Sequence, residues 1–316
     1  MLDDYNLYPL HVFGLVARGS SVTRAAEELH ISQPAVSAHL RSLEQRIGEP
    51  LFERTPRGML LTRAGEIILG QANRLLALYE ELPAAVNAAR GRVCGEVTVA
   101  ASSTPGAYCV PELLRQFQAK YPEAQPALIV GDSAQVLDWL REYRVPLGVV
   151  GEMVMDEGLH RIEVGADRLQ LVAAANDPLC HARQLTARHL KDRTLLLREA
   201  GSSTRSGAEA LLGERRKEFG RVAEISSTEA IKQSVISGLG VSVLSSWATK
   251  LEEEAGLLKP VRDARFRQQR RFYLVRRRDR TLNGAAAALW ECLLTCRPHS
   301  AAETRRRTDG KDARKR

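Results

Sequence analysis

Three short stretches rich in hydroxyl side chains have the composition of an anion-binding site. "SSTPG" (102–106) and "GSSTR" (201–205) each follow a predicted strand and open a predicted helix, and "SSTEA" (226–230) is a third helix start. Free backbone N–H groups and hydroxyls at helix starts bind carboxylate, phosphate or sulfate groups. The candidate ligand-binding residues are Ser102, Ser103, Thr104, Arg198, Ser202, Ser203, Thr204, Arg205 and Thr228.

The elements around these stretches predict the scaffold that would bring them together. From residue 92 onward, strand-like runs such as "GEVTVAAS" alternate with helical runs such as "PELLRQFQAKYP". This alternation predicts an α/β domain with a mostly parallel sheet. The segment is too long for one small sheet, so we expect two lobes, with chain crossings near 163–166 and 266–271. If the lobes face each other, the hydroxyl-rich stretches oppose each other across a cleft; ordinary helix N-caps remain the alternative interpretation.

No pattern of catalytic or metal-binding residues accompanies this expected cleft. The seven His are scattered without H-E-x-x-H spacing, and no P-loop, G-x-S-x-G or G-x-G-x-x-G motif has a suitable strand-to-helix context. The five cysteines lack zinc-site spacing, which favours small buried side chains, with a redox switch as the alternative. We therefore predict no catalytic residue, no metal site and no cofactor, only a small-molecule ligand of the anionic class.

The N-terminal stretch "SVTRAAEELHISQPAVSAHLRSLEQRIG" predicts two short helices joined by a tight turn. Ser32 is a good N-cap for the second helix, and Pro34 is tolerated in its first turn. The opposite face of that helix is small and polar, whereas its apolar face carries Val36, Leu40, Leu43 and Ile47. This pattern is typical of a helix-turn-helix, whose second helix enters the major groove of DNA.

The next stretch, "LFERTPRGMLLT", predicts a hairpin wing with cations placed for backbone phosphates. In the preceding helix, Gln33 can hydrogen-bond an adenine edge or a phosphate, and Pro34 and Ala38 can lie against thymine methyl groups. The candidate DNA-binding residues are Thr23, Ser32, Gln33, Pro34, Ser37, Ala38, Arg41, Arg54 and Arg57.

A long helix follows the predicted wing, and Thr62 can cap it. Its apolar positions alternate in steps of four and three, at Ile68, Ala72, Leu75, Tyr79, Leu82, Val86 and Ala89. Such a heptad seam predicts a partner helix; an amphipathic helix packed on its own domain is the alternative. Pro83 is awkward for the seam, because an interior Pro kinks or ends a helix.

The net charge of +8 does not mark the predicted DNA-binding segment. Residues 1–90 carry 9 Arg and no Lys against 10 Asp and Glu, whereas 262–280 and 297–316 carry the positive excess. The tail has no apolar periodicity, so we expect it to be disordered and solvated, with nonspecific phosphate attraction as the alternative. No apolar run reaches the length of a membrane span and the N-terminus lacks signal-peptide order, so we expect a cytoplasmic protein without membrane contact.

These motifs together resemble the LysR-type transcriptional regulators over essentially the full chain. The resemblance rests on "AAEELHISQPAVSAHLRSLEQRIG", "LFERTPRG", "LTRAGE", "PELLRQFQAKYP", "REAGSSTR" and "GLGVSVLS". The second half is similar to the branch with regulators of sulfur assimilation and Calvin-cycle carbon fixation. The resemblance implies a winged helix-turn-helix, a dimerising linker helix, and a two-lobed effector domain like periplasmic binding proteins.

The resemblance sets expectations for domains and partners. We expect the winged helix-turn-helix at 1–62, the linker helix at 63–91, the effector domain at 92–297 and the basic tail at 298–316. Lobe 1 comprises 92–163 and 268–297, and lobe 2 comprises 164–267. The implied partners are double-stranded operator DNA, a second copy through the linker helix, a homotetramer, and RNA polymerase as a candidate. An enzyme and a solute-binding protein fit the motifs less well, and a DNA-binding protein that ignores small molecules stays open.

Overall fold

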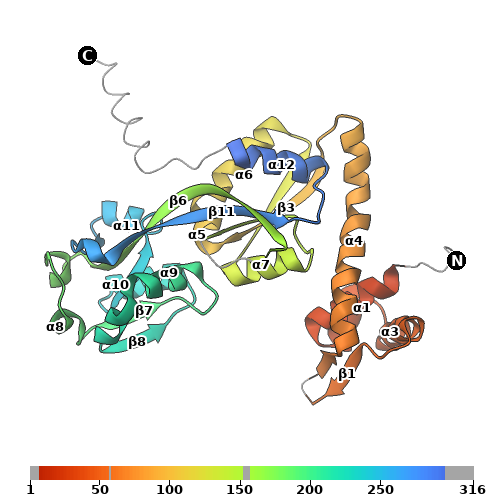
Figure 1. Cartoon of the computed structure of the whole chain (residues 1–316), viewed down its shortest axis with the longest axis horizontal. Helices are drawn as coiled ribbons and strands as arrows, with labels where there is room; N and C mark the ends of the chain where they lie inside the picture. Colours follow the sequence, from red (N-terminus) through yellow and green to blue (C-terminus); the bar gives the residue numbers. More distant parts are fainter. Residues whose placement is uncertain (1–6, 57, 152–156, 296–316) are drawn as a thin grey trace. The chain divides into compact units, whose positions relative to one another are not determined.

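The structure is a computed structural model that describes residues 7–56, 58–151 and 157–295. The chain divides into two compact units, an N-terminal one that ends at Val86 and a larger one that begins at Asn87. The predicted winged helix-turn-helix and α/β domain are both present (Figure 1). Within the described ranges, no helix is both long enough and apolar enough to cross a membrane. Arg57, Cys296 and the basic tail lie outside the described residues.

Short helices and a hairpin form the N-terminal unit, and a long helix follows them. Their bounds are α1 (Tyr8–Gly19), α2 (Val22–Leu29), α3 (Gln33–Ile47), β1 (Phe52–Thr55), β2 (Gly58–Leu61) and α4 (Arg63–Ala89). Ser32 Oγ accepts a hydrogen bond from the Ala35 N–H, and Thr62 Oγ1 accepts one from the Gly65 N–H. Both predicted caps are therefore confirmed, and they fix where α3 and α4 begin.

The apolar face of α3 closes the core of this unit. Val36, Leu40 and Leu43 are buried, as the sequence predicts, and they pack with side chains of α1, α2 and the hairpin. Ile47, predicted on the same face, is 40% exposed; it lies in the last turn, immediately before Gly48 ends the helix in a left-handed conformation. Burial of one face leaves the polar first turns of α3 open to solvent.

The hairpin is anchored to the turn after α1. The Met59 N–H donates to the Ser20 carbonyl at 3.0 Å. Gly58 has φ +115°, and a Cβ there would lie 2.5 Å from the Ser20 oxygen. Only glycine meets both conditions, so the backbone itself holds the wing against the helices.

The larger unit is built around one sheet, which has nine strands in the described part of the chain, in the order β4-β3-β5-β11-β6-β9-β7-β8 with β10 beside β6. One lobe contains β3 (Gly95–Ser102), α5 (Ser103–Tyr108), α6 (Val110–Lys120), β4 (Ala124–Gly131), α7 (Ser133–Arg141), β5 (Leu147–Gly151) and α12 (Gly284–Thr295). The two strands that cross between lobes are β6 (Leu159–Ala174) and β11 (Arg267–Arg277).

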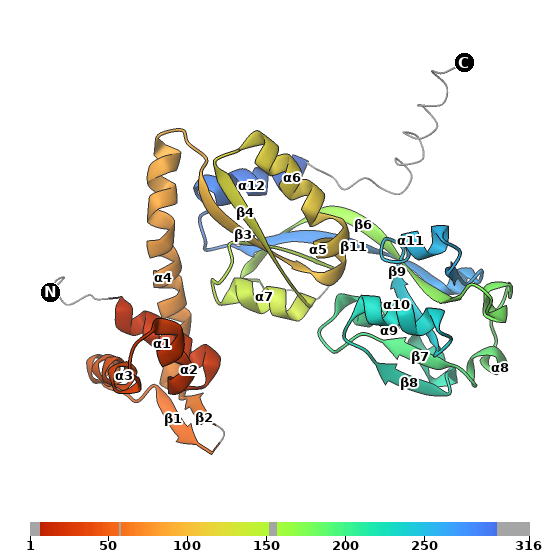
Figure 2. The ribbon, with the colours of Figure 1, turned by 180° about the vertical axis from the view of Figure 1, so that it is seen from behind.

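The second lobe contains the elements between these two long strands. They are η1 (Pro178–Cys180), α8 (Ala187–Leu190), β7 (Thr194–Leu197), α9 (Ser203–Leu212), η2 (Gly213–Glu218), β8 (Arg221–Glu224), α10 (Thr228–Ile236), β9 (Val241–Ser245), α11 (Lys250–Glu254), β10 (Leu258–Pro260) and η3 (Ala264–Phe266). In Figure 2, β3 and β4 lie at one end of the sheet and β7 and β8 at the other.

The sheet is mixed, where the sequence predicts a mostly parallel one. Within each lobe the prediction is right, because β3 pairs in parallel with β4 and β5, and β7 with β8 and β9. The pairs made by β6 and β11 are antiparallel. These two strands run in opposite directions between the lobes, so their pairing depends on chain crossings rather than on a local βαβ repeat. The expected crossings near 163–166 and 266–271 fall on these strands.

Helices cover both faces of each lobe, and a separate apolar cluster fills each face. Cys109, Cys180 and Cys292 lie buried within these clusters. Burial raises the pKa of the Cys109 thiol to about 12, so this thiol is protonated at neutral pH and behaves as a small apolar side chain.

Candidate functional site

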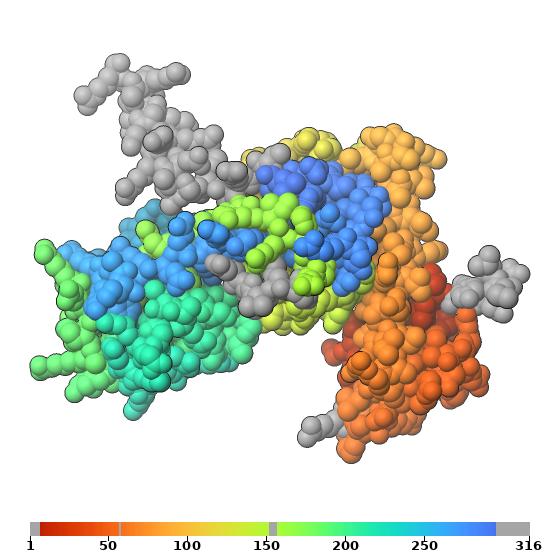
Figure 3. Space-filling view, viewed as in Figure 1, coloured from red at the N-terminus to blue at the C-terminus, as the bar shows by residue number. Residues whose placement is uncertain are grey.

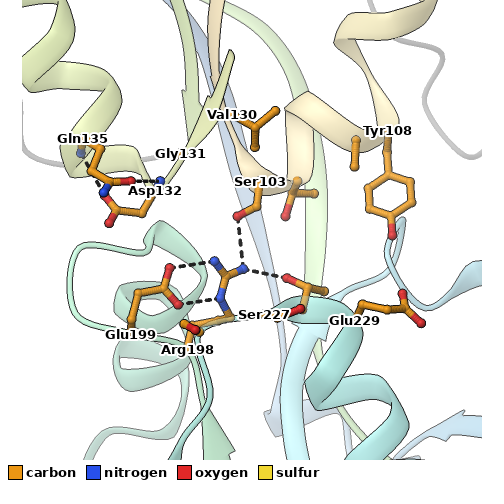
Figure 4. A pocket seen from close by; sticks show the side chains of 14 residues that line it. Ser103, Tyr108, Val130, Gly131, Asp132, Gln135, Arg198, Glu199, Ser227 and Glu229 are labelled. Atoms are coloured by element: carbon orange, nitrogen blue, oxygen red, sulfur yellow. Dashed lines mark hydrogen bonds and ion pairs between the residues drawn. The ribbon is translucent and has the colours of Figure 1, made fainter. Parts of the chain in front are cut away.

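A cavity of about 610 Å³ lies between the two lobes of the larger unit. Lobe 1 contributes α5, the end of β4 and the start of α7, and lobe 2 contributes the end of β7 and the start of α10 (Figure 4). This volume falls in the range of small-molecule sites, roughly 300–1,000 Å³. Hydroxyl and carboxylate side chains dominate the lining, which favours a polar ligand.

Arg198 is the cationic centre of this cavity. It follows β7 and is only 5% exposed. Its Nη1 donates to Thr228 Oγ1 at 2.6 Å and, across the cleft, to Ser103 Oγ at 3.1 Å. Its Nε and Nη2 donate to the two carboxylate oxygens of Glu199, each at 2.7 Å (Figure 4). The guanidinium therefore joins hydroxyls of both lobes and is held in one orientation.

Four of the predicted ligand-binding residues line the cavity: Ser103, Thr104, Arg198 and Thr228. They come from α5, from the end of β7 and from α10, which are separated by many residues in the chain. The hydroxyls of Ser103 and Thr228 meet on one arginine. The lobes thus face each other in the way the sequence predicts for these four positions.

The other five predicted residues lie outside the cavity lining. Ser102, Ser202, Ser203 and Thr204 are buried. Ser203, at the start of α9, packs closely against β5 of lobe 1, because a Cβ at Gly151 would come 2.3 Å from Ser203 Oγ. Arg205 instead pairs with Glu209 and Glu224 and donates to the Arg198 carbonyl at 3.0 Å.

A second buried arginine, Arg270 on β11, connects the two lobes behind the cavity. It pairs with Asp167, its partner across the β6–β11 ladder, at 2.9 Å. Its Nη2 donates to Thr104 Oγ1 in lobe 1 at 3.1 Å, and its Nη1 donates to Thr204 Oγ1 in lobe 2 at 3.0 Å. Burial lowers the pKa of the guanidinium, while the Asp167 carboxylate acts in the opposite direction. Sequence reasoning missed this residue, since nothing separates it from its Arg neighbours in 262–280.

Side chains that the sequence did not single out lie in the cavity lining or pair with lining residues. Lys232 is buried and pairs with Glu229 at 2.8 Å and Glu252 at 2.6 Å. Burial acts to lower the pKa of Lys232, but these hydrogen bonds outweigh it and raise the pKa. Partial burial raises the pKa of the Tyr108 phenol, which therefore stays protonated at neutral pH. Within the described residues, no group of three or more His, Cys, Asp or Glu is arranged to hold a metal ion.

The exposed start of α3 is the second candidate site. Gln33, Pro34, Ala38 and Arg41 are exposed, and Ser37 is half-buried at the flank of the helix. Ser32 is also exposed, although its Oγ already caps the helix. The surface is thus small, polar and unobstructed, as insertion into a groove requires.

The remaining predicted DNA-binding residues lie on neighbouring elements. Thr23 is exposed at the start of α2, and Arg54 is exposed on β1, opposite Met59 in the hairpin. Arg57 falls outside the described residues, so its position relative to these two is not described.

The predicted apolar stripe of α4 is largely exposed. Leu75, Tyr79, Leu82 and Val86 are 49–62% exposed, and the side chains of this helix are drawn in orange in Figure 3. Ala72, the second position of the stripe, is buried in the N-terminal core. Pro83 lies inside the helix without ending it. A row of large apolar side chains on one exposed face marks a surface that another protein surface buries.

A helix-turn-helix joined to a two-lobed domain with a polar cavity is the architecture of a DNA-binding regulator. The family model "Bacterial regulatory helix-turn-helix protein, lysR family" matches residues 7–66, and "LysR substrate binding domain" matches 90–296. The chain therefore belongs to the LysR family, which confirms the resemblance. It is a DNA-binding regulator with an effector-binding domain rather than an enzyme, and regulators of this family bind operator DNA and form oligomers.

Similar proteins include a regulator of a RuBisCO operon. The transcriptional regulator CbbR of Rhodospirillum rubrum is 34% identical, over 90% of this chain and 94% of that protein. A RuBisCO operon transcriptional regulator of Allochromatium vinosum is 33% identical, over 92% and 96% of the two chains. The solved regulatory domain of CcmR from Synechocystis, in complex with 2-PG, is 27% identical with a TM-score of 0.59 and covers 65% of this chain and 98% of its own.

Replacing Asp167 by Asn should destabilise the protein by about 3–5 kcal/mol, because it leaves the buried Arg270 charge without its counter-ion. Chemical denaturation of the full chain, followed by circular dichroism, measures this loss. The matched control is Asp138→Asn in the exposed pair with Arg141, which should cost no more than about 1 kcal/mol. Equal, small losses in both variants would show that the buried pair does not hold the lobes.

Proposed function

We propose that this chain binds operator DNA through α3 and the hairpin, and that a small anionic effector in the interlobe cavity changes that binding. The observation that carries the effector proposal is the buried Arg198, which donates hydrogen bonds to one hydroxyl of each lobe at the cavity. An anion at this guanidinium contacts both lobes at once and so favours one arrangement of the lobes. The 2-PG complex of the CcmR regulatory domain supports a ligand of this class.

On the DNA side, the proposed contacts are made by residues that present short polar or apolar groups. Gln33 reads an adenine edge or a phosphate, Pro34 and Ala38 lie against thymine methyl groups, and Arg41 serves either role. Thr23, Ser32, Ser37, Arg54 and Arg57 contact phosphates in this proposal. Two half-sites in a dimer explain how a near-neutral domain binds DNA, since each supplies a few local cations.

The proposed assembly is a homodimer through α4, and a homotetramer built from two such dimers. The exposed stripe on α4 supports the dimer, because a second stripe would cover it. The proposed domains are 1–62 for DNA binding, 63–91 for dimerisation and 92–297 for the effector, with a basic tail at 298–316. We also propose RNA polymerase as a partner and the cytoplasm as the compartment, since bacterial operator DNA is found there.

The named relatives support one class of target. Because CbbR and the RuBisCO operon regulator match nearly the whole chain, we propose that the controlled genes belong to carbon fixation.

The DNA-binding proposal predicts that Gln33→Glu abolishes operator binding without loss of fold. A carboxylate at this position repels phosphates, yet at a helix N-terminus it stabilises the helix dipole. Gel-shift titration on the operator measures binding, and the melting midpoint reports the fold. Gln118→Glu, an exposed change of the same charge on α6, is the control and should bind normally. Unaltered affinity in Gln33→Glu would remove α3 from the interface.

The assembly proposal predicts that changing Leu75 and Leu82 together to Asp yields monomers. The two carboxylates would face their counterparts in the seam, where desolvation and repulsion oppose association. Sedimentation velocity measures the change, and Ile67, exposed on the same helix but outside the stripe, provides the control as Ile67→Asp. An unchanged oligomer would place the dimer interface elsewhere.

The effector proposal predicts that 2-PG raises the melting midpoint of the wild-type chain and alters its DNA affinity. A ligand at a hundredfold excess over its Kd stabilises the native state by about 2.7 kcal/mol. Ser103→Ala with Thr228→Val removes both hydroxyls on Arg198 and should abolish both effects; Thr186→Val with Ser237→Ala changes hydroxyls outside the cavity and should abolish neither. Intact DNA binding without any response to 2-PG, phosphate or sulfate would indicate a regulator that ignores small anions.

A further inference from the structure

The place where an anion would bind Arg198 is already held by a carboxylate of the chain itself. Glu199 accepts from Nε and from Nη2 of Arg198, with both distances at 2.7 Å. This two-point contact is the one that a ligand carboxylate or phosphate makes with arginine. The other cavity contacts of the guanidinium are taken by Ser103 and Thr228 (Figure 4). An incoming anion therefore meets an occupied arginine.

The surrounding charges make simple addition of an anion unfavourable. Three carboxylates line the cavity, at Asp132, Glu199 and Glu229, and Arg198 is the cation among the lining residues. Lys232, which is not a lining residue, pairs with both Glu229 and Glu252. In a partly enclosed space, one further negative charge is repelled unless one carboxylate leaves.

Glu199 is placed so that it can leave. In its pair with Arg198, the Glu199 side chain is 20% exposed, whereas that of Arg198 is 5% exposed. Glu199 lines the cavity, so its carboxylate can turn toward solvent while the buried arginine stays fixed by its two hydroxyl partners. Rotation of the Glu199 side chain would thus free the Arg198 guanidinium to pair with a ligand anion.

The loop that carries Glu199 also contacts the opposite lobe. Within the loop, the Glu199 carbonyl accepts a hydrogen bond from the Ser202 N–H at 3.3 Å. The Gly201 carbonyl accepts one from the Ala134 N–H of lobe 1, also at 3.3 Å. Gly201 has φ +91°, and a Cβ there would lie 3.1 Å from an Asp132 carboxylate oxygen. A movement of Glu199 therefore acts on a loop that is in direct contact with lobe 1.

We infer that Glu199 is an internal competitor of the effector: the effector's anionic group displaces the Glu199 carboxylate from Arg198. This inference rests on the proposed function, in which the cavity takes an anion. It makes Glu199 a specificity-determining residue, because a ligand needs more than a single charge to displace the Glu199 carboxylate from Arg198. Small inorganic anions therefore bind more weakly than they would without Glu199, and this side chain sets the ligand concentration at which the cavity fills.

The test uses inorganic phosphate as the probe, with titration calorimetry on the full-length protein. In Glu199→Gln the neutral amide competes less well for the arginine, so the Kd for phosphate should fall at least about tenfold, which corresponds to about 1.4 kcal/mol. Glu224→Gln is the matched control, since Glu224 pairs with Arg205 outside the cavity; its Kd should equal that of the wild type.

The possible outcomes separate this inference from the proposed function. Tighter phosphate binding in Glu199→Gln but not in Glu224→Gln supports the competition. Equal or weaker binding in Glu199→Gln overturns it, and if 2-PG binding still depends on Ser103 and Thr228, the proposed effector site stands. Failure of every variant to bind phosphate or 2-PG overturns both. If Glu199→Gln does not fold, Glu199→Ala serves in its place with the same expected direction.

Discussion

The larger unit depends on one buried ion pair, Arg270 with Asp167, on the two strands that the lobes share. A buried pair of this kind is stable only when its remaining hydrogen-bonding groups are satisfied. Here Thr104 and Thr204 satisfy the guanidinium from opposite lobes. The requirement to solvate one charge therefore brings the starts of α5 and α9 together, and the cavity opens beside this junction.

The two buried arginines, Arg270 and Arg198, have different roles in the cleft. Arg270 is enclosed and its partners are all internal, so it fixes where the lobes meet. Arg198 lies at the cavity, shares hydroxyls with both lobes and has a carboxylate partner that is partly exposed. Arg270 holds the lobes together behind the cavity, and the carboxylate partner of Arg198 lies within it. A ligand that replaces this carboxylate can therefore change the contacts at the cavity and leave the buried core intact.

Local patterns predicted much of this structure. The caps at Ser32 and Thr62, the buried face of α3 and the alternation of strands and helices depend on neighbouring residues, which a sequence displays directly. Ser103, Thr104, Arg198 and Thr228 were found as cavity residues because each lies at a strand end or a helix start. Arg270, Glu199 and Lys232 were missed because their roles depend on partners brought near by folding. The burial of Ser203 depends on how closely Gly151 lets the lobes approach.

The order of the strands has a consequence for synthesis. The second lobe lies wholly between β6 and β11, so its residues form one continuous segment of the chain. The first lobe is completed from the far end: Leu289 and Trp290 of α12 fill its core, and β11 pairs with β5. During synthesis on the ribosome, the first lobe therefore begins to emerge before the second lobe but is completed after it. Until α12 has emerged, part of the apolar surface of β3 and α6 lacks its native packing partner, so the first lobe of the nascent chain closes only after residues 284–295 are made.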